Sequence, residues 1–427
     1  MKASNRFESL TIKVFSLVLL FLGLVYGVKV MHGHAVKFRT ESTSYDLMLR
    51  YNECACAHSG VNPYHVWNHD VVSEVFRGHR RPDMDYDLDV KKRIVHCYTP
   101  WHVTYTWLYG FMSFPHMAAY FYMLEGMLLL AMFRYLQKRI ANDDKMFVWS
   151  MLIFELAIPV VWCHVYGNYG IVLCALMAAL ICLSDRKREI TAGVVFGLML
   201  IKPQVSLLLV FPLMFQRRLK SVFVAGAICM FATLWPAYVY SESPIDLILQ
   251  IPRIGGPYGT TVDFVSAFGR MVGRQIPGIV WMCACVMACA YFSWRLRKCE
   301  YSFVRYAPAA FFFTYWTYSN QLDLMVGWPF LLTESAIILA MLRGQDRAKR
   351  ILACAYLIAR ICIFVGIGLI GAMHLCTQKI VEGLFCASHF LSFVMGVYVL
   401  LILPSMQREI RTIIPYRSCL RPHTSYP

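Results

Sequence analysis

The sequence is short of charge. Only 15% of its 427 residues are Asp, Glu, Lys or Arg, whereas 58% are hydrophobic and the mean hydropathy is +0.52. Soluble domains carry about 25% charged residues, so this composition excludes a soluble globular enzyme, a disordered chain and a fibrous protein. A membrane-spanning helix needs about 20 apolar residues. We therefore expect an all-α, polytopic integral membrane protein with about 12 transmembrane helices.

The sequence also lacks the usual cofactor and metal motifs. It contains no phosphate-cradling glycine loop, no dinucleotide fingerprint and no paired-cysteine metal motif. His65 and His69 have the helical spacing to share a zinc ion, but no third ligand follows at a fixed spacing. The sequence therefore predicts neither a cofactor nor a metal.

Disulfide-rich folds are excluded as well. Most of the 16 cysteines lie inside apolar runs, where a free cysteine behaves as a small hydrophobic residue. Only Cys54, Cys56 and Cys97 fall in a long polar stretch. One bridge that involves Cys97 is compatible with this pattern, and so is none.

The apolar runs divide the chain into alternating membrane and polar segments. The first run, from about Val14 to Met31, is longer than the apolar part of a cleavable signal peptide, so we interpret it as an uncleaved first span. The run from Trp101 to Phe114 is too short to cross, and we expect it at the membrane surface. The predicted segments are a cytoplasmic N-terminus with the first span (1–31), an extracytoplasmic loop with membrane-surface helices (32–114), a transmembrane core (115–240), a second extracytoplasmic loop (241–275), a C-terminal transmembrane bundle (276–404) and a basic cytoplasmic tail (405–427).

The net charge of +16 has a definite location. Basic residues exceed acidic ones in the N-terminal segment, in the tail and in the short loops after about Phe133, Leu183, Phe215, Trp294 and Leu342. By contrast, residues 32–102 hold nine basic and nine acidic residues, and residues 241–275 hold three of each. Cytoplasmic loops of membrane proteins carry this excess of Lys and Arg. Both termini are therefore predicted in the cytoplasm and both large loops outside, and nucleic acid is excluded as a partner.

Two charged residues stand where chemistry could occur. Asp46 follows Met31 by only 15 residues, so it can lie at the outer membrane surface and serve as a general base. An N-terminal helix cap fits Asp46 equally well. Lys202 precedes Pro203 at a break between two short spans, and a lysine at that depth is costly. Lys202 could bind an anion there, or extend to the interface merely to anchor the helix end.

Glu125 and Glu155 lie within predicted spans, which makes each a functional candidate or a hydrogen-bonding residue between helices.

Several short motifs occur in a familiar order. They are Gly60-Val61-Asn62-Pro63-Tyr64, Tyr98-Thr99-Pro100, Gly167-Asn168-Tyr169-Gly170 and Ala192-Gly193-Val194-Val195-Phe196-Gly197-Leu198 followed by Lys202-Pro203. Together with an Asp shortly after the first span, this order resembles the integral-membrane GT-C glycosyltransferases, and within them glycosyltransferase family 87. The similarity runs from about Tyr45 to Lys220.

The resemblance implies an enzyme that moves a sugar, mannose by family analogy, from a polyprenyl-phosphate carrier to an acceptor hydroxyl of a glycan or glycolipid. Transfer would occur with inversion, outside the cytoplasmic membrane and among its lipids. Asp46 would be the base, and Lys202 with Arg270 would contact the donor phosphate. Further sugar or acceptor contacts would come from Tyr45, Tyr64, Trp101, Gln321 and Asp323; the last two fall where family members tend to carry histidine.

Two other classes remain open. A transporter or flippase of a lipid-linked saccharide would place charges and broken helices near the midplane in repeated halves. The Lys202-Pro203 break has no counterpart in the other half of this sequence. A surface-glycan polymerase or ligase would use paired arginines in a large outer loop. The first outer loop has only Arg80-Arg81, beside an alternating acidic run at Asp83, Asp85, Asp87 and Asp89.

Overall fold

The fold is all-helical in the computed structural model, which describes residues 2–37, 45–58, 60, 62–64, 99–255, 278–316, 326–373 and 378–414. Every regular element in these ranges is a helix, which confirms the predicted all-α class. The longer helices are α1 (Lys2–Lys37), α2 (Tyr45–His58), α6 (Phe114–Gln137), α7 (Lys145–Tyr166), α8 (Gly170–Asp185), α9 (Glu189–Met199), α12 (Leu219–Tyr240), α13 (Pro244–Gly255), α15 (Gly278–Arg295), α16 (Ser302–Trp316), α17 (Trp328–Arg343), α18 (Arg347–Met373) and α19 (Gln378–Ile402). The shorter ones are α5 (Pro100–Tyr105), α10 (Pro203–Ser206), α11 (Val210–Phe215), α20 (Gln407–Ile413) and the 3₁₀ helices at Trp107–Phe111, Asn142–Asp144, Leu207–Leu209 and Leu403–Met406.

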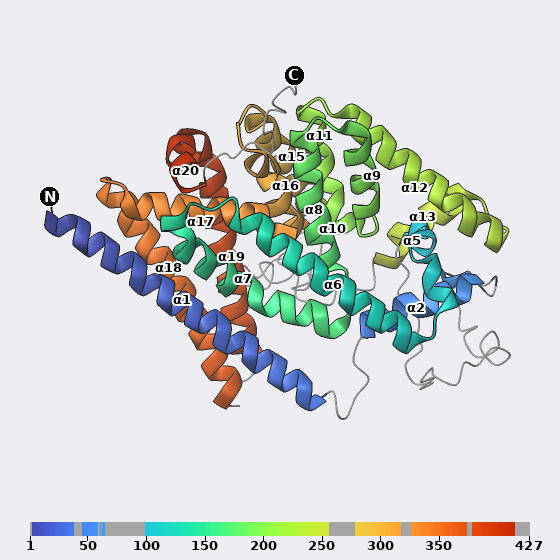
Figure 1. The fold of residues 1–427 in the computed structure, drawn as a ribbon, viewed down its shortest axis with the longest axis horizontal. Helices are drawn as coiled ribbons and strands as arrows, with labels where there is room; N and C mark the ends of the chain where they lie inside the picture. The colour runs from blue at the N-terminus through green and yellow to red at the C-terminus, as the bar shows by residue number, and fades with distance from the viewer. Residues whose placement is uncertain are drawn as a thin grey trace, which may run out of the picture.

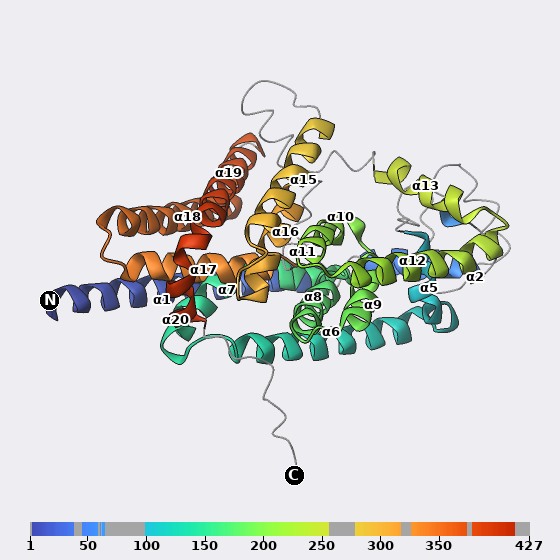
Figure 2. The same ribbon diagram turned by 90° about the horizontal axis from the view of Figure 1, so that it is seen from above.

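The helices gather into two ends and a centre (Figures 1 and 2). α1 lies along α7 and also contacts α17 and α18. In the centre, α9 packs against α8 and α12, and α16 packs against α15 and α17. α2, α5 and α13 lie together at the end opposite α18 and α20 in both views. That end holds the first residues of α2, where the sequence predicts chemistry.

Five helical segments in the described ranges are long and apolar enough to cross a membrane: Ser9–Lys29, Phe114–Gln137, Asn142–Tyr166, Leu219–Tyr240 and Phe390–Ile413. Large apolar side chains face outward on them; Phe223 and Tyr238 of α12, for example, are 74% and 85% exposed. Such exposed apolar surface is expected where lipid, not water, covers the protein. The chain is a membrane protein, and the segment boundaries drawn from the sequence stay predictions.

The count of about 12 crossings also stays a prediction, because several expected spans form shorter helices. Apolar helices of 10–17 residues occupy Gly170–Asp185, Glu189–Met199, Pro203–Phe215, Ile279–Arg295 and Phe303–Phe313. With 11 residues, α9 is only about 16 Å long. The hydrocarbon core of a bilayer is about 30 Å thick, so α9 alone cannot cross it.

α9, α10 and α11 form a hairpin whose tip is the Lys202-Pro203 break. α9 ends at Met199 and α10 begins at Pro203, as the sequence predicts for a proline at this point. At the other end of the hairpin, the Arg218 guanidinium donates to Glu189 Oε1 over 3.1 Å. The start of α9 and the residue before α12 therefore lie together, and Lys202 is carried to the far end.

Two glycines let α9 approach α12 closely. A Cβ at Gly193 would lie 2.6 Å from Val224 Cβ and 2.7 Å from the Ser221 carbonyl oxygen, and one at Gly197 would lie 3.4 Å from Ala225 Cα. Small residues four apart permit such backbone contact between membrane helices. The Ala-Gly-x-x-x-Gly motif thus fixes the hairpin against α12.

Candidate functional site

Asp46 lies at the start of α2 and contacts the turn between α7 and α8. An acidic residue in the first turn of a helix is favoured by the helix dipole. Its Oδ2 accepts a hydrogen bond of 2.6 Å from Asn168 Nδ2. Asp46 is therefore tied to a residue 122 positions away, and its carboxylate interacts with more than its own helix.

Asn168 uses both ends of its side-chain amide. While Nδ2 donates to Asp46, Oδ1 accepts from Lys202 Nζ at 3.1 Å and from the Gly170 backbone N–H at 3.1 Å. The Asn168 and Lys202 side chains are 2% and 1% exposed, whereas Asp46 is half-buried. One amide thus joins a carboxylate on α2 to the ammonium group at the tip of the α9–α11 hairpin.

Gly167 shapes the turn that presents Asn168. It ends α7 in the left-handed conformation, with φ of +65°, which glycine adopts without steric cost. A Cβ on Gly167 would lie 2.5 Å from Leu47 Cβ. The missing side chain therefore lets α2 pack directly onto the turn and brings Asp46 within reach of Asn168.

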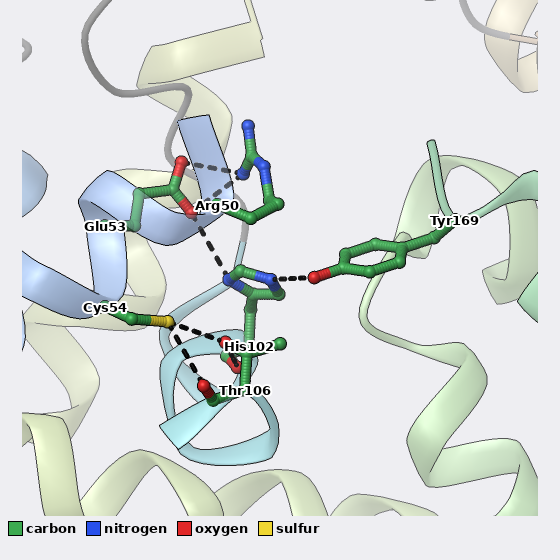
Figure 3. Close-up of polar contacts among 6 residues, drawn as sticks. All are labelled: Arg50, Glu53, Cys54, His102, Thr106 and Tyr169. Atoms are coloured by element: carbon green, nitrogen blue, oxygen red, sulfur yellow. Dashed lines mark hydrogen bonds and ion pairs between the residues drawn. The ribbon is translucent and has the colours of Figure 1, made fainter. Parts of the chain in front are cut away.

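A second polar cluster, drawn in Figure 3, includes Tyr169, which follows Asn168 in the chain. Arg50 and Glu53 of α2 form a buried ion pair, with an Arg50 guanidinium nitrogen 2.7 and 2.8 Å from the two Glu53 carboxylate oxygens. Glu53 Oε2 lies 3.3 Å from His102 Nδ1 of α5. His102 Nε2 lies 3.1 Å from the hydroxyl of Tyr169, the residue after Asn168. Burial lowers the pKa of the fully buried His102.

Cys54 anchors the same face of α2 to α5. Its Sγ lies 2.9 Å from Thr106 Oγ1 and 3.4 Å from the Thr106 carbonyl oxygen (Figure 3). Burial raises the pKa of the Cys54 thiol to about 12, so it stays protonated and can donate. Cys54 and Cys56 are both free and buried. Cys97 lies outside the described residues.

Two of the predicted sugar or acceptor contacts are buried. Trp101 is 8% exposed, and its indole Nε1 donates to the Leu200 carbonyl oxygen at 3.1 Å. Trp101 therefore supports the end of α9, two residues before Lys202. Tyr64 is 1% exposed, and its backbone N–H donates to Asn62 Oδ1 at 2.8 Å. A sugar contact from either side chain stays a prediction.

The remaining expectations fall in three groups. The side chain of Tyr45 and the residues Arg270, Gln321 and Asp323 lie outside the described part of the chain, as do His65, His69 and the acidic run. Among the described residues no group of three or more His, Cys, Asp or Glu side chains could hold a metal ion. Glu125 contacts His164 at 3.3 Å and Glu155 pairs with Arg360 of α18, so both link helices.

The sequence alone does not bring together five residues that the structure places in these two clusters: Arg50, Glu53, His102, Asn168 and Tyr169. One usable signal was present, since Asp46, Arg50 and Glu53 recur at i, i+4 and i+7 and therefore share one helix face. Nothing in the sequence indicates that this face meets α5 and the α7–α8 turn.

The described residues form an all-helical membrane protein. Asp46, Asn168 and the buried Lys202 meet in it where α2 contacts the α7–α8 turn. The chain belongs to glycosyltransferase family 87, whose family model matches residues 96–319, more than half of its length. The protein is therefore a glycosyltransferase. No curated protein and no solved structure gives a significant match. His102, Asn168, Tyr169 and Lys202 lie inside the matched region, and Asp46 lies before it.

Proposed function

We propose that this glycosyltransferase moves mannose from a polyprenyl-phosphate carrier to a hydroxyl of a glycan or glycolipid acceptor. The reaction takes place on the extracytoplasmic face of the cell membrane. The observation that carries the proposal is the chain of hydrogen bonds from Asp46 through Asn168 to Lys202. It puts a carboxylate and an ammonium group on one shared amide, so a base and an anion-binding group serve the same site.

The chemistry is a single displacement. Asp46 takes the proton from the acceptor hydroxyl, and the acceptor oxygen forms a bond to the anomeric carbon. The bond between that carbon and the carrier phosphate breaks on the opposite face, and the electron pair leaves with the phosphate. Lys202 stabilises the developing negative charge, and Arg270 is proposed as a second contact. Attack opposite the leaving group inverts the anomeric configuration.

The Asn168 amide can support both proposed roles, that of Asp46 as the base and that of Lys202 as the phosphate contact. Nδ2 donates to the carboxylate and Oδ1 accepts from the ammonium, so the amide binds each charged group at a different end. Asp46 can then receive a proton while Lys202 attracts the phosphate. Preorganised groups of this kind contribute more in a water-poor site than in solvent.

The test uses purified full-length protein with radiolabelled polyprenyl-phosphate mannose and membrane glycolipid acceptors. Wild-type protein should transfer the label, and Asp46→Asn should lose about 100- to 10,000-fold in kcat, because a positioned base contributes 10² to 10⁴. The matched control is Asp246→Asn, an exposed carboxylate on α13, which should transfer normally. Transfer by Asp46→Asn at the wild-type rate would contradict the role of Asp46. Transfer from the glucose-charged carrier alone would contradict mannose.

A further inference from the structure

Glu53, His102 and Tyr169 join the two elements that carry Asp46 and Asn168. α2 carries both Asp46 and Glu53, seven residues apart and therefore about 10 Å apart along the same face. The α7–α8 turn carries Asn168 and Tyr169 as neighbours. Asn168 contacts the first turn of α2, and Tyr169 reaches Glu53 through His102. The turn is thus fastened to α2 at two separated points.

We propose that Glu53, His102 and Tyr169 form a positioning clamp that holds Asn168 between Asp46 and Lys202. This inference rests on the proposed function for its kinetic part. None of the three residues reaches the reacting atoms in this role. The clamp sets the separation between α2 and the α7–α8 turn, and that separation fixes the Asp46–Asn168 hydrogen bond.

One assignment of donors and acceptors is compatible with both contacts of the His102 ring. His102 is fully buried and burial lowers its pKa, so the ring is uncharged at neutral pH and has one N–H. With that hydrogen on Nδ1, the ring faces the Glu53 carboxylate with a donor, and Nε2 accepts the Tyr169 O–H. Arg50 neutralises Glu53 from the other side. Each contact therefore fixes the orientation of the next group, as in other supporting shells of active sites.

The clamp also explains why so many polar groups are buried beside the site. Arg50, Glu53 and His102 are all at most 2% exposed. Taking charged groups out of solvent costs free energy, and an apolar contact between α2 and α5 would avoid that cost. Apolar contacts are non-directional, however, whereas this chain of polar contacts fixes a single orientation of the turn.

The leading variant is Tyr169→Phe, because it removes one hydroxyl and leaves the ring packed on Phe121. The matched control is Tyr306→Phe on α16, which removes a buried hydroxyl bonded to Ser184 at 2.8 Å. Tyr169→Phe should lower kcat about tenfold, since small displacements of reacting groups cost this much or more. Tyr306→Phe should leave kcat unchanged.

A double-mutant comparison with Asn168 distinguishes a positioning role of Tyr169 from a purely structural one. In an Asn168→Ala background, where the bridge is already gone, Tyr169→Phe should change kcat by less than about twofold. A tenfold loss in both backgrounds would overturn the clamp, because Tyr169 would then act independently of Asn168. An unchanged kcat in the single variant would overturn it as well.

Hydrogen exchange tests the clamp without any sugar donor. In full-length protein in nanodiscs, Tyr169→Phe should speed amide exchange in α2 and in the α7–α8 turn, and Tyr306→Phe should not. Unchanged exchange in both segments would overturn the clamp. If wild-type protein transfers no sugar from any polyprenyl phosphate, the proposed function fails, and the exchange experiment still decides the clamp.

Discussion

Lys202 is the residue at which we expect stability and activity to oppose each other. Its side chain is 1% exposed, and a buried ammonium is costly wherever a neutral side chain of similar length would fit. The Asn168 Oδ1 atom that accepts from Lys202 Nζ also accepts from the Gly170 backbone N–H. Removing the lysine therefore leaves the Asn168 carbonyl with a donor. A residue that is expensive for folding and still present is best explained by its chemistry.

Lys202→Met should consequently keep or raise the melting temperature while lowering kcat/KM about 100-fold, the size of loss found when one preorganised donor is removed from an active site. Thermal unfolding of the detergent-solubilised protein and donor-dependent transfer measure the two effects. Lys220→Met, which changes an exposed lysine of α12, is the control for both. A fall in melting temperature together with normal transfer would contradict this assignment.

Among the elements, the α7–α8 turn supplies two adjacent residues of the candidate site, Asn168 and Tyr169. Four consecutive residues, Gly167 to Gly170, end one helix, supply the Asn168 bridge, supply the Tyr169 hydroxyl and begin the next helix. The turn must also lie against α2 at a distance that admits no Cβ on Gly167. Backbone conformation and close packing therefore make separate demands on the same glycine.

Gly167→Ala should separate these two demands. The left-handed conformation costs an alanine about 1–2 kcal/mol, and the contact with Leu47 adds to this by pushing α2 away. Gly60→Ala is the matched control, since Gly60 has φ of +71° and open space around its Cβ position. Gly167→Ala should lower both the melting temperature and sugar transfer more than Gly60→Ala does. Equal effects in the two variants would show that the close approach of α2 is unimportant.

For the whole molecule, ion pairs join the loops that the sequence assigns to the cytoplasm. Arg305 lies 3.2 Å from Asp185, Arg411 lies 2.9 Å from Glu300, and Arg343 pairs with Asp144. The exposed Arg411–Glu300 pair contributes little stability, and all three pairs serve here as markers of position. These pairs bring together loops that are distant in sequence, and their common side of the membrane stays a prediction.

Reporter fusions test this sidedness. Alkaline phosphatase fused after Ser241 should be active, because that junction is predicted outside, and the same enzyme fused after Lys298 should be inactive. A fluorescent protein that folds only in the cytoplasm should give the reverse pattern at both junctions. Activity of the phosphatase after Lys298 would contradict the predicted orientation and would move the Asp46 site away from the extracytoplasmic face.

The helical membrane class can be predicted from the sequence, because the length of the apolar runs and the low charge content reflect a lipid environment. The sequence also located the break at Lys202-Pro203, since the effect of proline on the backbone is local. It did not establish the number of crossings: an apolar run such as Glu189–Met199 forms a helix too short to span.

Which polar groups meet depends on how segments distant in sequence pack together. Asp46 and Asn168 are 122 residues apart, and Asn168 and Lys202 are 34 apart. A hydrogen bond needs its atoms within about 3 Å, and that proximity depends on how α2, the α7–α8 turn and the α9–α11 hairpin pack. The motif at Gly167–Gly170 is visible in the sequence, but its role arises from the partners that packing brings to it.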